Sequence, residues 1–221
     1  MTQQGTTIPD YSIVQIMIQI LIDDIRGVLL HPNKFFQNVR ESGLPHAYRQ
    51  YIVLLAFFSV IAGWIRMFDN DHAIREMLQI VPDYGPYIAE KICPIIAEFG
   101  VAIIIGTFLA GIYLVFIAGA LIHPFILLVG GEQGFSQTMK VQMYAATPTL
   151  LFGWVPVMGI IGIVWSSIIM VVGLKECAGL SLIRSVLAVI VPIFLFASFF
   201  LIIIITIQSF TMFLNPIYWL T

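Results

Sequence analysis

The chain has 221 residues, of which 60% are hydrophobic and only 10% are charged, and its net charge is −2. Soluble domains carry about 25% charged residues, so this composition excludes an ordinary water-soluble domain and offers no basic surface for nucleic acid. Two stretches, Phe99–Gly131 and Ser185–Thr221, contain no Asp, Glu, Lys or Arg. Charge-free runs of this length are typical of membrane spans, and we therefore predict an integral membrane protein.

The first apolar segment, Asp10–Leu30, predicts an amphipathic helix rather than a span, because its uninterrupted apolar run is short. Its polar residues recur every three or four positions and share one helical face; they are Ser12, Gln15, Gln19, Asp23 and Arg26. The apolar face opposite them suits a helix lying in the membrane interface. The alternative is that this face covers other helices of the protein. In the short helix that Pro32 begins, Phe35 and Phe36 are expected to dip into lipid.

Residues 49–221 predict an all-α membrane domain, a polytopic bundle of five transmembrane helices. The five predicted spans are 50–68, 95–128, 138–155, 157–174 and 185–208. The second is longer than a hydrocarbon core of about 30 Å requires, and we expect a bend at His123-Pro124. One very long helix over residues 138–174 is an alternative to two spans. Pro156 and the glycines around it favour a tight turn in the middle, and thus two spans.

Small residues mark the helix faces on which another helix can pack closely. Ala102, Gly106 and Ala110 recur every four positions in the second span. Such spacing forms a small-residue seam that lets two backbones approach each other. Gly159 and Gly162, in the fourth span, are also expected at helix contacts.

The basic residues support the five-span arrangement and give it an orientation. With five spans, seven basic residues lie on one side of the membrane: Arg26, Lys34, Arg40, Arg49, Lys140, Lys175 and Arg184. The other three, Arg66, Arg75 and Lys91, lie on the opposite side. Basic residues gather on the cytoplasmic side, so we predict a cytoplasmic N-terminal segment, residues 1–48, and a C-terminus outside. A single span over residues 138–174 would leave five basic residues on each side.

Two stretches of this sequence resemble a known family. LLHPNKFFQNV (Leu29–Val39) places Pro-x-x-Phe-Phe before the first span, and GGEQGFSQTMKVQMYAATP (Gly130–Pro148) is followed by GLKECAGLS (Gly173–Ser181). The first is similar to the segment that precedes the first span in the Yip1 domain family, in particular its prokaryotic members. The second is similar to that family's central signature. The resemblance implies five membrane helices and a cytosolic N-terminus.

The same resemblance bears on location and partners. A prokaryotic-type member implies the cell membrane, with a eukaryotic endomembrane as the alternative. Eukaryotic relatives are linked to vesicle trafficking and to small GTPase partners of the Rab type. Their Asp-Leu-x-Gly-Pro motif is not found in this sequence, which puts GTPase binding in doubt.

Two ionisable residues of the second span are candidates for function. Glu98 and His123 lie in an apolar segment, and ionisable side chains within a membrane usually indicate a functional site. Both lie near the ends of a long helix, so a solvated helix end is the alternative for each. At 25 positions apart they are too distant to act as a pair on one helix.

A polar stretch, Gln142, Tyr144 and Thr147 followed by Pro148, opens the third span. Unpaired polar groups are costly in a membrane, so one interpretation is helix packing with satisfaction of the backbone. The other is a polar seam in a solute or ion path, where broken helices tend to gather.

The sequence offers no catalytic, cofactor or metal site. It contains no nucleophile elbow and no His-Glu-x-x-His motif, and Cys93 and Cys177 match no metal-ligand spacing. We therefore predict a non-enzymatic protein that organises membrane or partner proteins, as a homo-oligomer or with other membrane proteins. The alternative is a small solute or ion transporter or channel, with its path near the kinked third and fourth spans.

Overall fold

The computed structural model describes residues 13–68, 87, 90–91 and 100–214, and every regular element within them is a helix. The helices are α1 (Ile13–Leu30), α2 (Pro32–Val39), α3 (Leu44–Phe68), α6 (Gly100–Leu128), α7 (Phe135–Ala145), α8 (Thr147–Phe152), α9 (Pro156–Ala178) and α10 (Leu182–Leu214). For this part of the chain the all-α prediction is confirmed.

Four of these helices have the length and apolar composition of a membrane span. They cover Leu44–Ile65, Val101–Leu128, Val157–Ala178 and Leu182–Ser209. The predicted first, second, fourth and fifth spans each overlap one of them. The four long apolar helices thus agree with the composition in indicating a membrane protein. The start of the predicted second span, residues 95–99, lies outside the described residues.

The predicted third span consists of two short helices, α7 and α8, which meet at Ala146. Pro148 has no backbone N–H to continue the helical ladder. The next N–H, that of Thr149, donates to Ser166 Oγ on α9 at 3.3 Å. The missing N–H of Pro148 and the outward bond of Thr149 therefore accompany the division of this segment into two helices. A fifth crossing of the membrane stays a prediction.

A turn separates α8 from α9 where the sequence predicts one. α8 ends at Phe152, and α9 begins at Pro156, whose fixed φ and missing N–H suit the first position of a helix. The alternative of one helix over residues 138–174 is therefore wrong.

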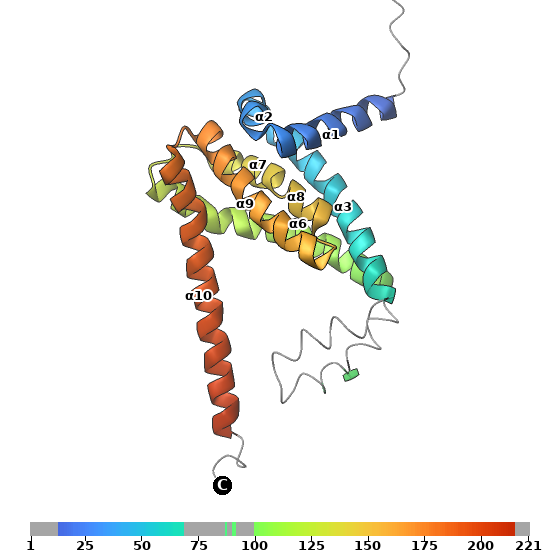
Figure 1. The fold of residues 1–221 in the computed structure, drawn as a ribbon, viewed down its shortest axis with the longest axis vertical. Coiled ribbons are helices and arrows are strands. Elements are labelled where there is room, and N and C mark those ends of the chain that lie inside the picture. The colour runs from blue at the N-terminus through green and yellow to red at the C-terminus, as the bar shows by residue number, and fades with distance from the viewer. Residues whose placement is uncertain (1–12, 69–86, 88–89, 92–99, 215–221) are drawn as a thin grey trace, which may run out of the picture.

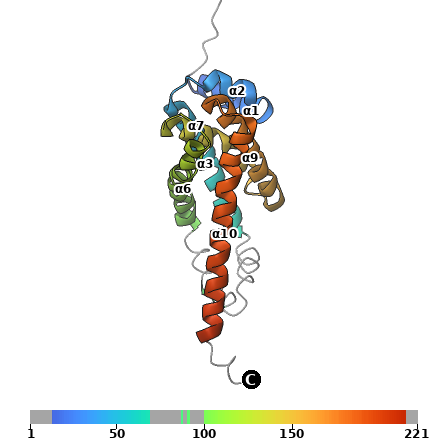
Figure 2. The ribbon, with the colours of Figure 1, turned by 90° about the vertical axis from the view of Figure 1, so that its left-hand side faces the viewer.

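Basic residues gather where several helix ends meet at one end of the molecule. Figure 1 shows α1 and α2 at that end, with α1 lying across the long axis, and α10 running away to the opposite end. In Figure 2, turned by 90°, α1, α2 and α7 again lie together. Gln37 on α2 donates to Glu176 at the end of α9 (2.9 Å). The seven basic residues that the sequence places on one side all lie on the elements that converge here.

The core lies where α2 packs on α7 and α9. The Phe36 and Tyr144 side chains are fully buried, and their rings meet edge to face with centroids 6.2 Å apart. Gly173 gives them room, because a Cβ there would lie 2.8 Å from the Phe36 ring. The expectation that Phe35 and Phe36 dip into lipid is wrong, since both are buried against α7 and α9.

Candidate functional site

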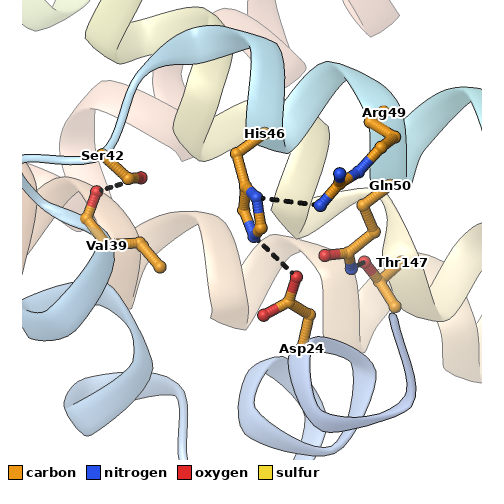
Figure 3. Close-up of polar contacts among 7 residues, drawn as sticks. All are labelled: Asp24, Val39, Ser42, His46, Arg49, Gln50 and Thr147. Carbon is orange, nitrogen blue, oxygen red and sulfur yellow. Dashed lines mark hydrogen bonds and ion pairs between the residues drawn. The ribbon is translucent and has the colours of Figure 1, made fainter. Parts of the chain in front are cut away.

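The polar side chains inside the bundle form two groups. The first, the junction cluster, consists of Asp24 on α1 with His46 and Arg49 on α3 (Figure 3). The second, the buried seam, consists of Gln50 on α3 with three residues of α7 and α8, namely Gln142, Tyr144 and Thr147. Both groups lie close to the end of the molecule where the basic residues gather.

The junction cluster ties α1 to α3 through one imidazole ring. His46 Nε2 lies 2.8 Å from Asp24 Oδ2, and Arg49 Nη2 lies 3.2 Å from His46 Nδ1. Positions three apart on a helix share a face, which places His46 and Arg49 side by side. A guanidinium can only donate, so Nδ1 accepts from Arg49, and the proton on Nε2 is donated to Asp24. The result is a directed chain of hydrogen bonds from Arg49 to Asp24.

Burial dominates the electrostatics of the Asp24 carboxyl. Burial raises its pKa above the ordinary value of 3.8, while the hydrogen bond from His46 and the charge of Arg49 act in the opposite direction. The folded protein therefore holds this proton more tightly than the unfolded chain does. Such a group stabilises the fold at low pH, and the contribution is lost as the pH rises through the folded pKa.

The variant Asp24→Asn tests this pH dependence of stability. Asn keeps an acceptor for His46 but has no charge to desolvate, so we expect a higher thermal unfolding midpoint than wild type at about pH 7. The gain should shrink as the pH falls through the raised pKa of Asp24 in the folded protein, and it should be lost below the ordinary value of 3.8, where the unfolded chain is protonated as well. Unfolding in detergent over a pH series measures this, with Asp23→Asn, at an exposed neighbour, as the control. A gain that grows on acidification would contradict the assignment.

The buried seam joins α3 to α8 across the core. Gln50 Nε2 donates to Thr147 Oγ1 at 3.2 Å, although the two residues are 97 positions apart (Figure 3). Gln50 is 2% exposed and Thr147 is fully buried. Three buried polar atoms of the seam have no hydrogen-bond partner among the described residues: Gln50 Oε1, Gln142 Oε1 and the Tyr144 hydroxyl. Buried polar atoms without a partner are rare in folded proteins, which makes the seam a candidate site.

A groove of about 410 Å³ lies beside the seam, lined by residues of α6 to α10. Its polar lining residues are Gln142, Thr149, Ser166 and Ser167. The Thr149 and Ser166 hydroxyls bond to each other at 2.8 Å. The groove therefore offers hydroxyl and amide groups between otherwise apolar helices.

The other candidates of the sequence have more local roles or lie elsewhere. His123 Nδ1 lies 2.9 Å from Thr138 Oγ1, and its ring meets that of Phe135, so the half-buried His123 links α6 to α7. Pro148 is fully buried at the start of α8. Glu98 lies outside the described residues.

The predicted packing residues fall into two environments. Ala102, Gly106 and Ala110 are exposed, and a Cβ on Gly106 would meet no atom within 4 Å. The role of these three residues in packing stays a prediction. Gly162 is buried where α9 approaches the backbone of α8, and Gly159 is buried against Gly153, the residue that follows α8.

Comparison with protein families identifies the chain. The model of the Yip1 domain matches residues 26–205, from the second half of α1 into α10. The chain belongs to the Yip1 domain family. No curated protein and no solved structure matches it. The match covers His46, Arg49 and the buried seam, whereas Asp24 and the first half of α1 precede it.

Sequence reasoning missed the junction cluster of this Yip1 domain chain. Asp24 and His46 are 22 positions apart on different helices, so no spacing rule pairs them. Gln50 offered a signal, because an amide at the start of a span needs a partner. Among the described residues no group of three His, Cys, Asp or Glu side chains is placed to hold a metal ion.

Two tyrosines of this domain provide a matched test of the seam. The Tyr51 hydroxyl donates to the Gly111 carbonyl at 2.8 Å, so Tyr51→Phe is expected to lower the free energy of unfolding by about 1 kcal/mol. The Tyr144 hydroxyl is buried and has no hydrogen-bond partner among the described residues. Tyr144→Phe should therefore change stability by less than about 0.5 kcal/mol or increase it. A larger loss for Tyr144→Phe than for Tyr51→Phe in thermal unfolding would show that the Tyr144 hydroxyl is bonded.

Proposed function

We propose that the chain is a non-enzymatic, five-pass membrane protein that organises membrane or partner proteins at the cytoplasmic face. In this arrangement α7 and α8 together make the third crossing. The N-terminal segment lies in the cytoplasm and the C-terminus outside, in a prokaryotic cell membrane. The seven basic residues lie on elements that meet at one end of the molecule, which supports this orientation because basic residues gather on the cytoplasmic side.

The uncovered first half of α1 is the observation that supports this proposal most. Ile16 and Met17 are each 47% exposed and Ile20 is 37% exposed, although all three are apolar. The second half of α1 packs on the protein, where Val28 is fully buried. Because α1 lies across the long axis at the basic end, its free apolar side chains are placed to enter the interface (Figure 1). A helix of this kind gives the protein a surface that is sensitive to lipid and accessible to partners.

The depth of α1 in the bilayer tests the proposal. Spin labels at positions 17 and 20 in liposomes should contact oxygen in the bilayer, and labels at Gln19 and Asp23 should contact a water-soluble nickel chelate. Gln19 and Asp23 bond to each other on the helix surface at 3.1 Å. Equal exposure of both pairs of labels to the nickel chelate would contradict the interfacial position of α1.

The orientation of the protein in the membrane is tested by thiol labelling. Lys34→Cys and Lys91→Cys, each in a background without Cys93 and Cys177, are treated with a membrane-impermeant thiol reagent on intact cells. Both native side chains are exposed. We expect labelling at position 91 only, whereas labelling at position 34 from outside would reverse the topology.

Self-association tests the organising role. The exposed stripe of Ala102, Gly106 and Ala110 offers a face for close approach of another membrane helix. Photobleaching of labelled protein in liposomes should show more than one copy per complex, and Ala110→Leu should reduce that number. A single copy at all protein densities, with no partner cross-linked in cell membranes, would contradict the organising role.

A second candidate function rests on the polar groove beside Gln142. A groove lined by one amide and three hydroxyls between apolar helices suits a path for a small solute or ion. Proteoliposomes then should pass protons or glycerol faster than empty liposomes, and Gln142→Leu should abolish the difference. No flux above that of empty liposomes would exclude this path for the solutes tested and favour the organising function.

A further inference from the structure

A cleft of about 310 Å³ lies between α1 and the first half of α3. Its apolar lining residues are Met17, Ile18, Ile20 and Leu21 on α1, and Val53 on α3. The junction cluster and Gln50 complete the lining. The contact of Asp24 with His46 pins the two helices together, and the apolar residues lie farther from it along both helices. The cleft thus combines a long apolar part with a polar end, at the lower end of the size range of small-molecule sites.

Helical periodicity explains why both helices present the same combination. Met17, Leu21 and Asp24 follow one another at intervals of four and three on α1, so they share a face. His46, Gln50 and Val53 do the same on α3. Each face runs from polar to apolar as it leaves the junction. Such a gradient matches a molecule with a polar head and a hydrocarbon tail.

The polar end of the cleft selects the head group. The Arg49 side chain is exposed, and a guanidinium fork binds phosphate oxygens through two parallel hydrogen bonds. The Asp24 carboxylate, on the α1 side of the cleft, disfavours a head group of purely negative charge. A head group that fits therefore carries a phosphate for Arg49 and a cationic N–H donor for Asp24.

We propose that this cleft binds a phospholipid whose head group has a primary ammonium, of the phosphatidylethanolamine type. One acyl chain lies along Met17, Leu21 and Val53. The phosphate contacts Arg49, and the ammonium donates to the Asp24 carboxylate. A choline head group lacks N–H donors, and a glycerol head group lacks the positive charge. This inference rests on the proposed position of α1 at the membrane surface, where acyl chains reach the cleft.

Lipid retention by the purified full-length protein tests the inference. Native mass spectrometry is carried out in detergent after adding equal amounts of phosphatidylethanolamine, phosphatidylcholine and phosphatidylglycerol. We expect one retained phosphatidylethanolamine in preference to the other two. Because no bilayer is present, the result does not depend on how deeply α1 inserts, so failure here is distinguishable from failure of the proposed function.

Matched variants locate the site. Val53 and Val60 lie on the same helix and are 44% and 49% exposed, but only Val53 lines the cleft. Val53→Trp should abolish the retained lipid, and Val60→Trp should leave it in place. Arg49→Gln should weaken retention about fivefold, the value of one exposed charge contact, whereas Arg26→Gln, outside the cleft, should not.

Three outcomes would overturn the inference. They are a preference for phosphatidylglycerol or phosphatidylcholine, equal retention by Val53→Trp and Val60→Trp, and equal retention by Arg49→Gln and wild type. A second measurement uses the wild-type protein and therefore does not depend on the folding of any variant. Phosphatidylethanolamine with a photoactivatable diazirine in its acyl chain should cross-link to residues 17–21 and to Val53, and cross-links confined to other helices would exclude the site.

Discussion

Lys140→Met is expected to lower the free energy of unfolding by about 3 kcal/mol, because one buried ammonium holds the connection between α2 and α3. Lys140 is 3% exposed, and its Nζ donates to the carbonyls of Val39, Arg40 and Ser42 at 2.9, 2.7 and 2.8 Å. All three donors of the ammonium are used. Met fills similar space but donates nothing, so the three carbonyls lose their partner at once.

The thermal unfolding midpoint in detergent measures this loss. A change of this size should lower the midpoint by about 6 to 12 °C for a chain of this length. Lys175→Met is the control, since the Lys175 side chain is 45% exposed and contacts only its neighbour Glu176 among the ion pairs of the described residues. We expect the control to change stability by less than about 0.5 kcal/mol. Equal losses in the two variants would show that the three carbonyls do not depend on Lys140.

Gly162→Leu is the second large expected effect, again about 3 kcal/mol of destabilisation. Gly162 is buried on α9 facing α8, and a Cβ there would lie 3.1 Å from the Pro148 carbonyl oxygen and 3.3 Å from Thr149 Cα. These neighbours are backbone atoms, which cannot rotate away as a side chain does. A leucine must therefore push α9 from α8 and disturb the turn between them.

Gly106→Leu provides the matched control, because a Cβ at Gly106 meets no atom within 4 Å. Leucine has a higher helix propensity than glycine by up to about 1 kcal/mol, so this variant should be neutral or slightly more stable. The two unfolding midpoints should differ by about 6 to 12 °C. If Gly162→Leu is tolerated as well as Gly106→Leu, the close packing of α8 on α9 is wrong.

Contacts between distant parts of the chain explain where prediction failed. Phe35 and Phe36 have the composition of a lipid-dipping pair, yet α7 and α9 cover them. The sequence does not single out Gly111, yet Tyr51 on α3 donates to its carbonyl, whereas the packing role of Ala102, Gly106 and Ala110 stays a prediction. An apolar pattern predicts that a helix face avoids water. It does not predict whether lipid or another helix covers that face, since lipid chains are as apolar as leucine.

The polar contacts between helices could not be predicted from the sequence for a related reason. Asp24 with His46, Gln50 with Thr147, and Lys140 with the α2–α3 connection pair residues that are 22, 97 and about 100 positions apart. Apart from Thr147, none of these residues is marked as a candidate by the sequence of its own segment. Only the packing of α1, α3 and α7 around one another turns them into contacts.

The sequence by itself determined the membrane class of this protein, its helical content, the family signature and the turn between α8 and α9. These follow from local chemistry: charge-free length, the missing N–H of proline and the freedom of glycine. The tertiary structure alone decided which apolar faces are buried in protein, where Lys140 finds its acceptors, and that α1 and α3 enclose a cleft with a polar end. Those outcomes depend on distances between segments that no local pattern encodes.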